Sequence, residues 1–307
     1  MRLWVRRRLG RGSGRRCVRG VLVGVPLLVG ATLFTLEEIR ECGGVGLPLD
    51  DAWIYAALAR DLAEGRPAEG VGPPPGDRGG GHPLSAATSP LWCLILAAGR
   101  FVLAPWTGGG DPDGTAAVWL SRTVGMTAGW IACGLALRVA TRISGVRSVG
   151  WAIAILLAVQ PRFVRGVVSG FEVPVYVGLT LAGVDAHLRW RDSPGLRGVG
   201  APIFFALAGW ARPECFLLLV LERSVTGFMG QGGGRRGAAL VKSVVTGGLL
   251  AAPFGLFFLW LWGHPLPTSF AVKARDASLL SGSGEGLLAA LWNSLSFQFR
   301  VWGGYLP

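Results

Sequence analysis

Charged residues are scarce in this chain. They make up 16% of its 307 residues, whereas an ordinary soluble domain carries about 25%. Hydrophobic residues account for 51%, and the mean hydropathy is +0.47. Because the apolar residues stand in long blocks, the composition excludes an ordinary soluble domain and indicates a membrane protein with helical spans.

Several familiar signatures are also missing. The five cysteines show no Cys-x-x-Cys pair and no Cys/His spacing typical of zinc, so we expect them to serve packing. No Walker A sequence is present, which excludes a nucleotide-driven pump, and no Gly-x-Ser-x-Gly elbow occurs. The histidines His82, His187 and His264 are too dispersed for a metal triad. The sequence therefore predicts no zinc site built from cysteine or histidine.

Acidic residues are few, 18 against 30 basic ones, and the net charge is +12. All the basic residues except Lys242 and Lys273 are arginines. A basic chain can bind nucleic acid, but these arginines cluster at the ends of apolar blocks. Their placement instead indicates how the chain is oriented in a membrane, and we expect no nucleic-acid partner.

The N-terminus reads as a membrane anchor. Eight arginines fall within residues 1–19, and an apolar run follows over 20–36. This run ends in Thr35-Leu36-Glu37-Glu38 without a small-x-small cleavage site, which favours a retained anchor over a cleaved signal peptide. The basic segment 1–19 is then cytoplasmic, and residues from 38 onward emerge outside.

The later apolar blocks can pass through the membrane in two ways, which we call threadings. One crossing per block would leave the arginine-rich loops 141–148 and 189–199 outside. In the favoured threading, 89–106 lies in the outer interface and 200–221 breaks at Pro213, which keeps those loops inside. The expected fold is an all-α, polytopic membrane protein with about seven transmembrane helices. Its parts are the basic segment 1–19, a transmembrane module 20–262 with an external loop 38–115, and an external segment 263–307.

The first external loop opens with an amphipathic pattern. Trp53, Ile54, Ala57, Leu58 and Leu62 fall on one helical face. The pattern predicts a short helix lying on the membrane surface. Residues 65–83 are rich in glycine and proline and are expected to form a loop.

Three carboxylates are candidates for catalysis. Asp50 and Asp51 lie just outside the first span, where a membrane-bound substrate would present its head group, and either one is a candidate general base. Their alternative role is to cap a helix. Glu172, at the outer start of a later span, is a candidate to orient the acceptor, to assist the base or to hold a divalent cation. Its alternative role is a favourable charge at a helix N-terminus.

Cationic side chains on the predicted outer side run against the orientation bias and are candidate ligands of a lipid-linked phosphate. Snorkelling to lipid head groups is their alternative role. Glu214 is a candidate site residue beside one of them, or simply its ion-pair partner. The cationic candidates are Arg162, Arg165, Arg212, His264 and Lys273.

The order of these motifs resembles a known superfamily. A basic N-terminus and one span precede Asp50-Asp51-Ala-Trp-Ile-Tyr. Then come Ala87-Thr-Ser-Pro-Leu-Trp92, Ser169-Gly-Phe-Glu-Val-Pro174, Ala211-Arg-Pro-Glu214 and His264-Pro-Leu-Pro-Thr-Ser-Phe270. This order is similar to that of the GT-C membrane glycosyltransferases, which use polyprenyl-phosphate sugars. The closer likeness is to the branch with the mycobacterial terminal arabinofuranosyltransferase; protein O-mannosyltransferases and the aminoarabinose transferase are more distant.

The resemblance implies a function. It makes Asp50 or Asp51 the base, Glu172 the second acidic site, and Arg212 and Lys273 ligands of the lipid phosphate. The donor would be a polyprenyl-phosphate sugar, and the acceptor a hydroxyl of a glycan, lipid or protein at the outer face of the cell membrane. With one base opposite the leaving phosphate, transfer would invert the anomeric centre. No cofactor is implied beyond a divalent cation that some members need.

The sequence also departs from that superfamily. Gly/Pro-rich residues fill the loop after the acidic pair, Phe171 and Val173 replace the commoner Leu and Thr, and Leu266-Pro-Thr-Ser lacks the usual Asn. Members usually continue with more spans, so residues 263–307 are expected to begin an incomplete C-terminal part. Two alternatives stay open: a non-catalytic or truncated paralogue, and a transporter or lipid-flipping protein that uses intramembrane charges such as Arg100, Arg122 and Arg212.

Overall fold

The computed structural model describes residues 13–48, 50–66, 82–85, 87–107, 114–192, 200–229, 236–263 and 265. In these residues the secondary structure is helical throughout, without a strand, so the all-α prediction is confirmed for them. The helices are α1 (Ser13–Cys42), α2 (Asp50–Glu64), η1 (Pro83–Ser85), α3 (Pro90–Thr107), α4 (Thr115–Ser144), α5 (Arg147–Val159), α6 (Pro161–Val168), α7 (Val173–Asp192), α8 (Gly200–Ala211), η3 (Pro213–Cys215), α9 (Phe216–Met229) and α10 (Arg236–Trp262).

Local chemistry explains where the helices end. Gly145, with φ of 71°, terminates α4 and donates its backbone N–H to the carbonyl of Thr141 at 2.9 Å. α6 begins with Pro161 at its first position, where a missing N–H costs nothing. The predicted break at Pro213 is present: Arg212 is extended, as a residue before proline prefers, and separates α8 from α9.

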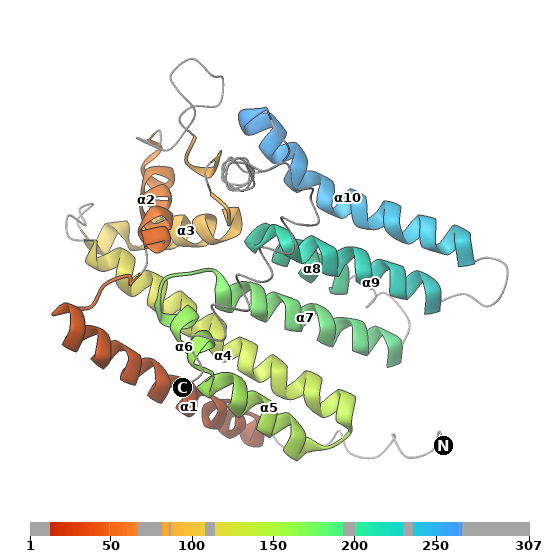
Figure 1. Ribbon diagram of the computed structural model, residues 1–307, viewed down its shortest axis with the longest axis horizontal. Coiled ribbons are helices and arrows are strands. Elements are labelled where there is room, and N and C mark those ends of the chain that lie inside the picture. The colour runs from red at the N-terminus through yellow and green to blue at the C-terminus, as the bar shows by residue number, and fades with distance from the viewer. Residues whose placement is uncertain are drawn as a thin grey trace, which may run out of the picture.

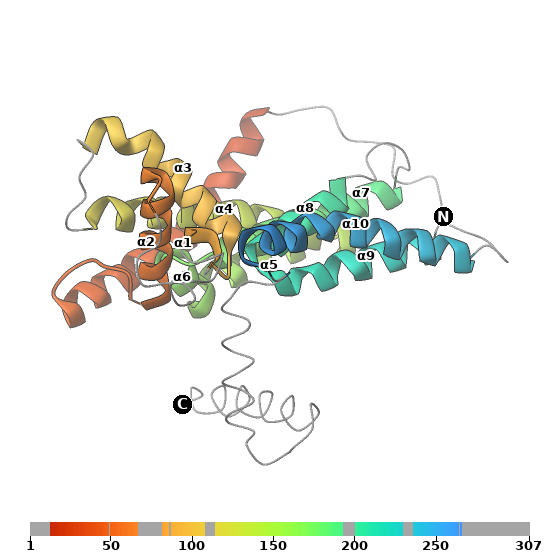
Figure 2. The same ribbon diagram turned by 90° about the horizontal axis from the view of Figure 1, so that it is seen from above.

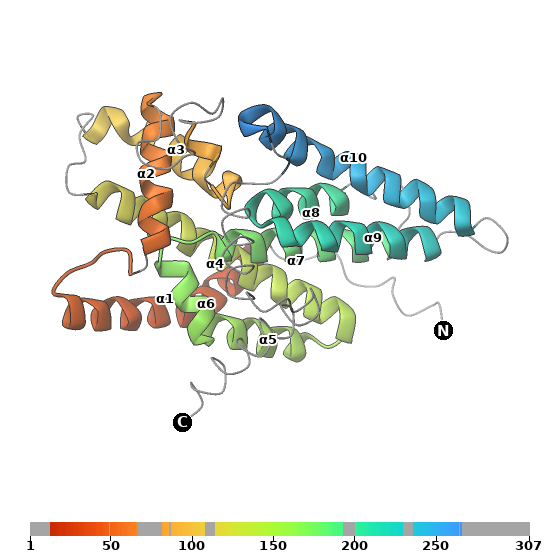
Figure 3. The ribbon, with the colours of Figure 1, turned by 45° about the horizontal axis from the view of Figure 1, so that its top comes forward.

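The long helices lie side by side and leave the molecule with two distinct ends (Figure 1). One end, which we call the α2 end, contains α2, α3, the C-terminus of α1, the turn between α6 and α7, and the last turns of α10. At the opposite end, which we call the arginine end, α4 turns into α5, α7 and α9 finish, and α10 begins. Figure 2, the view from above, shows that α7, α8, α9 and α10 extend away from α2. Figure 3 shows that α2 runs across the direction of the long helices.

Two segments, Thr115–Ser144 of α4 and Val244–Leu261 of α10, are long and apolar enough to cross a membrane. α5 and α6 together would make a third span, bent by 59° at their junction. These findings come from length and composition, and they support a helical membrane protein. They do not reach the seven spans expected from the sequence, which stay a prediction.

Buried carboxylates hold the arginine end together. Asp185 of α7, 2% exposed, accepts a hydrogen bond from Arg189 and forms an ion pair with Arg138 of α4 at 2.9 Å. Glu222 of α9 accepts two bonds from Arg223, at 2.6 and 2.8 Å. Because each carboxylate is paired, the arginines here have a structural role in addition to the membrane orientation that the sequence predicts from them.

Candidate functional site

The acidic pair lies at the start of α2. The side chain of Asp51 is exposed, and that of Asp50 lies outside the described residues. The chain enters α2 through Leu47, whose carbonyl accepts a hydrogen bond from Trp53 Nε1 at 3.0 Å. The acidic pair therefore lies in a turn whose flanking residues, Leu47 and Trp53, are hydrogen-bonded to each other.

α2 buries one face against the rest of the protein. Ala52, Tyr55 and Ala59 are 1%, 6% and 0% exposed, whereas Trp53 and Ile54 are 40% and 44% exposed. Trp53 and Ile54 stay on the outer side because α2 packs its small residues and its tyrosine against α3 and the turn after α6. That α2 lies on a membrane surface with these two residues on its apolar face stays a prediction.

The turn between α6 and α7 presents Glu172. Gly170 in this turn has φ of 82°, and the Nε1 of the fully buried Trp92 donates to its carbonyl at 2.9 Å. The carbonyl of Glu172 accepts from the N–H groups of Val175 and Tyr176 and so opens α7. Two motifs that are far apart in the sequence, 87–92 and 169–174, are thus joined by a hydrogen bond.

Glu172 is buried and paired with Arg212. The carboxylate is 2% exposed, and its Oε1 accepts from Arg212 Nε at 2.7 Å. Its other oxygen has no hydrogen-bond partner in the described part of the chain. The predicted alternative that Glu214 pairs with Arg212 is wrong for the described residues, since Glu172 takes that position and Glu214 is exposed.

Arg212 is a partly exposed cation. Its side chain is 43% exposed, and its guanidinium carbon lies 5.5 Å from the centroid of the Tyr176 ring. Burial by itself lowers the pKa of Arg212, but the charge and hydrogen bond of Glu172 outweigh that effect and raise it. The bond to Glu172 uses Nε, and among the described residues the two terminal nitrogens have no hydrogen-bond partner. A half-exposed cation that a buried carboxylate holds in place suits an anionic ligand.

Tyr55 adds a phenol beside this ion pair, and sequence reasoning gave it no role. Its hydroxyl is hydrogen-bonded to Thr88, and its ring meets that of Phe171 edge to face at 6.5 Å. Burial, and then the charge of Glu172, raises the pKa of Tyr55. Both Tyr55 and Thr88 stand in the quoted motifs, so their closeness in sequence to Asp51 and Trp92 was the available signal.

The other predicted residues lie apart or outside the described chain. Arg162 and Arg165 are exposed on α6. His264 and Lys273 are outside the described residues, so their predicted roles remain predictions. In the part of the chain that the structure describes, no three His, Cys, Asp or Glu side chains gather as they would around a metal ion.

A cavity of about 420 Å³ lies between α1 and α4, with Val168 of α6 in its wall. Its lining is mainly apolar and includes Trp119 and Arg122 but none of the candidate site residues. The candidate site therefore rests on the contacts around Glu172, and this cavity is a separate feature.

Comparison of the chain with protein-family models, curated proteins and solved structures finds no significant match.

Proposed function

We propose that this protein is a membrane glycosyltransferase that moves a sugar from a polyprenyl phosphate to an acceptor hydroxyl on the outer face of the cell membrane. The observation that carries the proposal is the Arg212 guanidinium. It is half exposed and is held by the buried Glu172. Because Glu172 belongs to the turn between α6 and α7, this contact puts Arg212 at the same end of the molecule as the acidic pair. A cation stabilises the charge that grows on a leaving phosphate, and arginine suits phosphate because it can bind in a bidentate way.

In this proposal Asp50 or Asp51 removes the proton from the acceptor hydroxyl, and the resulting oxygen attacks the anomeric carbon. The bond from that carbon to the phosphate oxygen breaks, and the phosphate leaves with the electron pair. Arg212 neutralises its growing charge. One base opposite the leaving group gives inversion. Among the roles predicted for Glu172, its contact with Arg212 favours holding that cation in place.

The proposed topology has about seven spans, namely α1, α4, α5, α7, α8, α9 and α10. It is supported by the arrangement of the helix ends. Arg142, Arg147 and Arg189 belong to helix ends at the arginine end, opposite the acidic motif. By the positive-inside bias, the arginine end would be cytoplasmic and the α2 end external.

The transporter alternative has less support. It needs intramembrane charges available along a pathway. The three arginines considered for it are each paired with a carboxylate: Arg100 with Glu64 at 4.0 Å, Arg122 with Glu38, and Arg212 with Glu172 at 2.7 Å. Pairing is usual for charges inside a membrane, so these arginines give the transporter alternative no specific support.

The test is to incubate membranes that contain the protein with labelled polyprenyl-phosphate sugars. Asp50→Asn and Asp51→Asn are made separately, and at least one of them should abolish transfer without loss of membrane expression. Glu37→Gln, at an exposed carboxylate whose ion-pair partner is Arg40, is the matched control and should retain activity. Full activity in both aspartate variants would sink the proposal. Absence of transfer by the unaltered protein would favour the non-catalytic alternative.

A further inference from the structure

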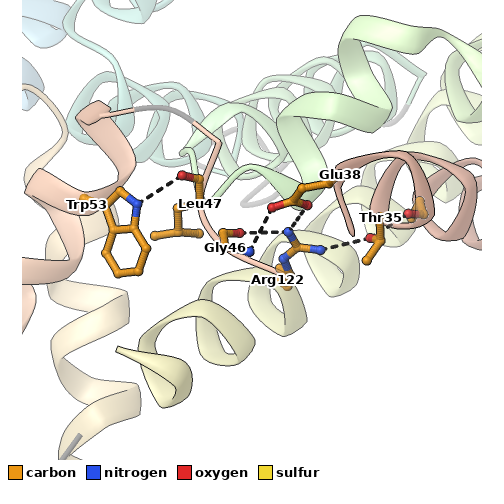
Figure 4. Close-up of polar contacts among 7 residues, drawn as sticks. Thr35, Glu38, Gly46, Leu47, Trp53 and Arg122 are labelled. Carbon is orange, nitrogen blue, oxygen red and sulfur yellow. Dashed lines mark hydrogen bonds and ion pairs between the residues drawn. The ribbon is translucent and has the colours of Figure 1, made fainter. Parts of the chain in front are cut away.

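A second buried ion pair lies next to the acidic motif, and the proposed reaction does not use it. Arg122 of α4 and Glu38 of α1 are each 7% exposed, and Arg122 Nη2 donates to Glu38 Oε2 (Figure 4). Arg122 Nη1 also donates to Thr35 Oγ1 at 2.9 Å. Such a pair is weak evidence for stability, because removing two charges from water costs free energy that their attraction barely repays. Its geometry therefore calls for another explanation.

The pair holds one residue of the loop before α2 at both of its backbone groups. Glu38 Oε1 accepts from the N–H of Gly46 at 2.8 Å, and Arg122 Nη2 donates to the carbonyl of Gly46 at 2.8 Å. Figure 4 shows these two contacts on either side of Gly46. Both charges are needed, since the carboxylate can only accept and the guanidinium can only donate.

From Gly46 the constraint passes to the acidic motif. The next residue, Leu47, is 5% exposed, and its carbonyl accepts from Trp53 in the first turn of α2. Its side chain fills the space beside Gly170, where an added Cβ would lie 2.7 Å from Leu47 Cδ2. The loop before the acidic pair is thus hydrogen-bonded to α1 and α4 through Gly46, and to α2 through Leu47. It also packs against the turn that carries Glu172.

We infer that Arg122 is a positioning residue: through Glu38 and Gly46 it sets the place of the first turn of α2 and hence of the acidic pair. The kinetic side of this inference rests on the proposed function. Arg122 touches no proposed substrate group, and its effect on transfer would pass through the aspartates. A displacement of about 1 Å at a reacting group can lower the rate about 100-fold.

The matched control is Arg138, on the same helix and likewise bound to a buried carboxylate, but at the arginine end. Arg122→Met and Arg138→Met are compared by hydrogen–deuterium exchange of the full protein in nanodiscs, and by transfer kinetics. Arg122→Met should speed amide exchange at residues 45–47 and 51–53, and should lower kcat about 100-fold with little change in donor KM. Arg138→Met should leave that exchange and kcat near the unaltered values.

Arg122→Lys is the second variant, usable if Arg122→Met does not accumulate in membranes. One ammonium lacks the guanidinium fork, so it should show the same pattern with a smaller change. Unchanged exchange at the loop in both Arg122 variants, or equal changes in Arg138→Met, would overturn the inference. If the unaltered protein transfers no sugar, the proposed function fails, and the exchange comparison still decides whether Arg122 positions the loop.

Discussion

Arg212 Nε lies 2.7 Å from Glu172 Oε1, and the two residues come from motifs 40 positions apart. The two partners differ in exposure: the Glu172 side chain is 3% exposed and that of Arg212 is 43% exposed. Water therefore reaches the cation and hardly reaches the carboxylate. This asymmetry means that the two halves of the pair cannot be removed at equal cost.

Arg212→Met should destabilise the protein more than Glu172→Gln. The first change leaves a buried carboxylate without its partner, which costs about 3 kcal/mol, the low end of the range for breaking a buried pair, since Arg212 is half exposed. The second leaves a cation that water can solvate, and it should cost about 1 kcal/mol. Unfolding in detergent followed by circular dichroism measures both. The reverse order would show that the pair is not organised around the buried carboxylate.

Tyr55 should titrate abnormally. Burial, followed by the charge of Glu172, raises its pKa above the ordinary value of about 10. The folded pKa then exceeds the unfolded one. The stability that the protonated phenol contributes is thus complete below about pH 10 and is lost as pH rises through the folded pKa. Between those pH values the unaltered protein should lose stability more steeply than Tyr55→Phe. Thermal melts at several alkaline pH values test this, and equal slopes would contradict it.

The sequence was informative where one residue decides the local structure. Pro213 predicted the break between α8 and α9, because proline removes a donor and restricts the residue before it. The motifs at 87–92 and 169–174 were singled out together, and Trp92 is bonded to Gly170. Helix patterns and breakers are local, so a single chain reveals them.

The pairings could not be predicted in the same way. Glu214, two positions from Arg212, was the nearest acidic residue in sequence, but Arg212 pairs with Glu172 across two helices. Arg122 and Glu38 are 84 residues apart. Likewise the buried face of α2 depends on which neighbours cover it, and Trp53 is left half exposed. Contacts of this kind follow from tertiary packing, which hydrophobic periodicity does not specify.

Asp185→Asn should separate stability from transfer. Asp185 is bound to Arg138 and Arg189 at the arginine end, away from the acidic motif. Both arginines are about half exposed, so they can turn to water when the carboxylate becomes an amide. The change should cost about 1 kcal/mol of stability and leave kcat unchanged at a temperature where the variant stays folded. A specific loss of kcat would show that the arginine end takes part in the reaction.

Gly170 and Gly43 provide a controlled test of how tightly the Glu172 turn is packed. Both have positive φ, 82° and 74°, so alanine is strained at either position by about 1–2 kcal/mol. At Gly43 an added Cβ would meet nothing within 4 Å, so the strain is the whole effect. At Gly170 the same atom would lie 2.7 Å from Leu47 and 3.3 Å from Ala52. Gly170→Ala should therefore cost about 1–3 kcal/mol more than Gly43→Ala. It should also lower transfer, because relief of the clash moves the turn away from α2. Equal melting temperatures for the two variants would mean that the turn and α2 are not held in contact.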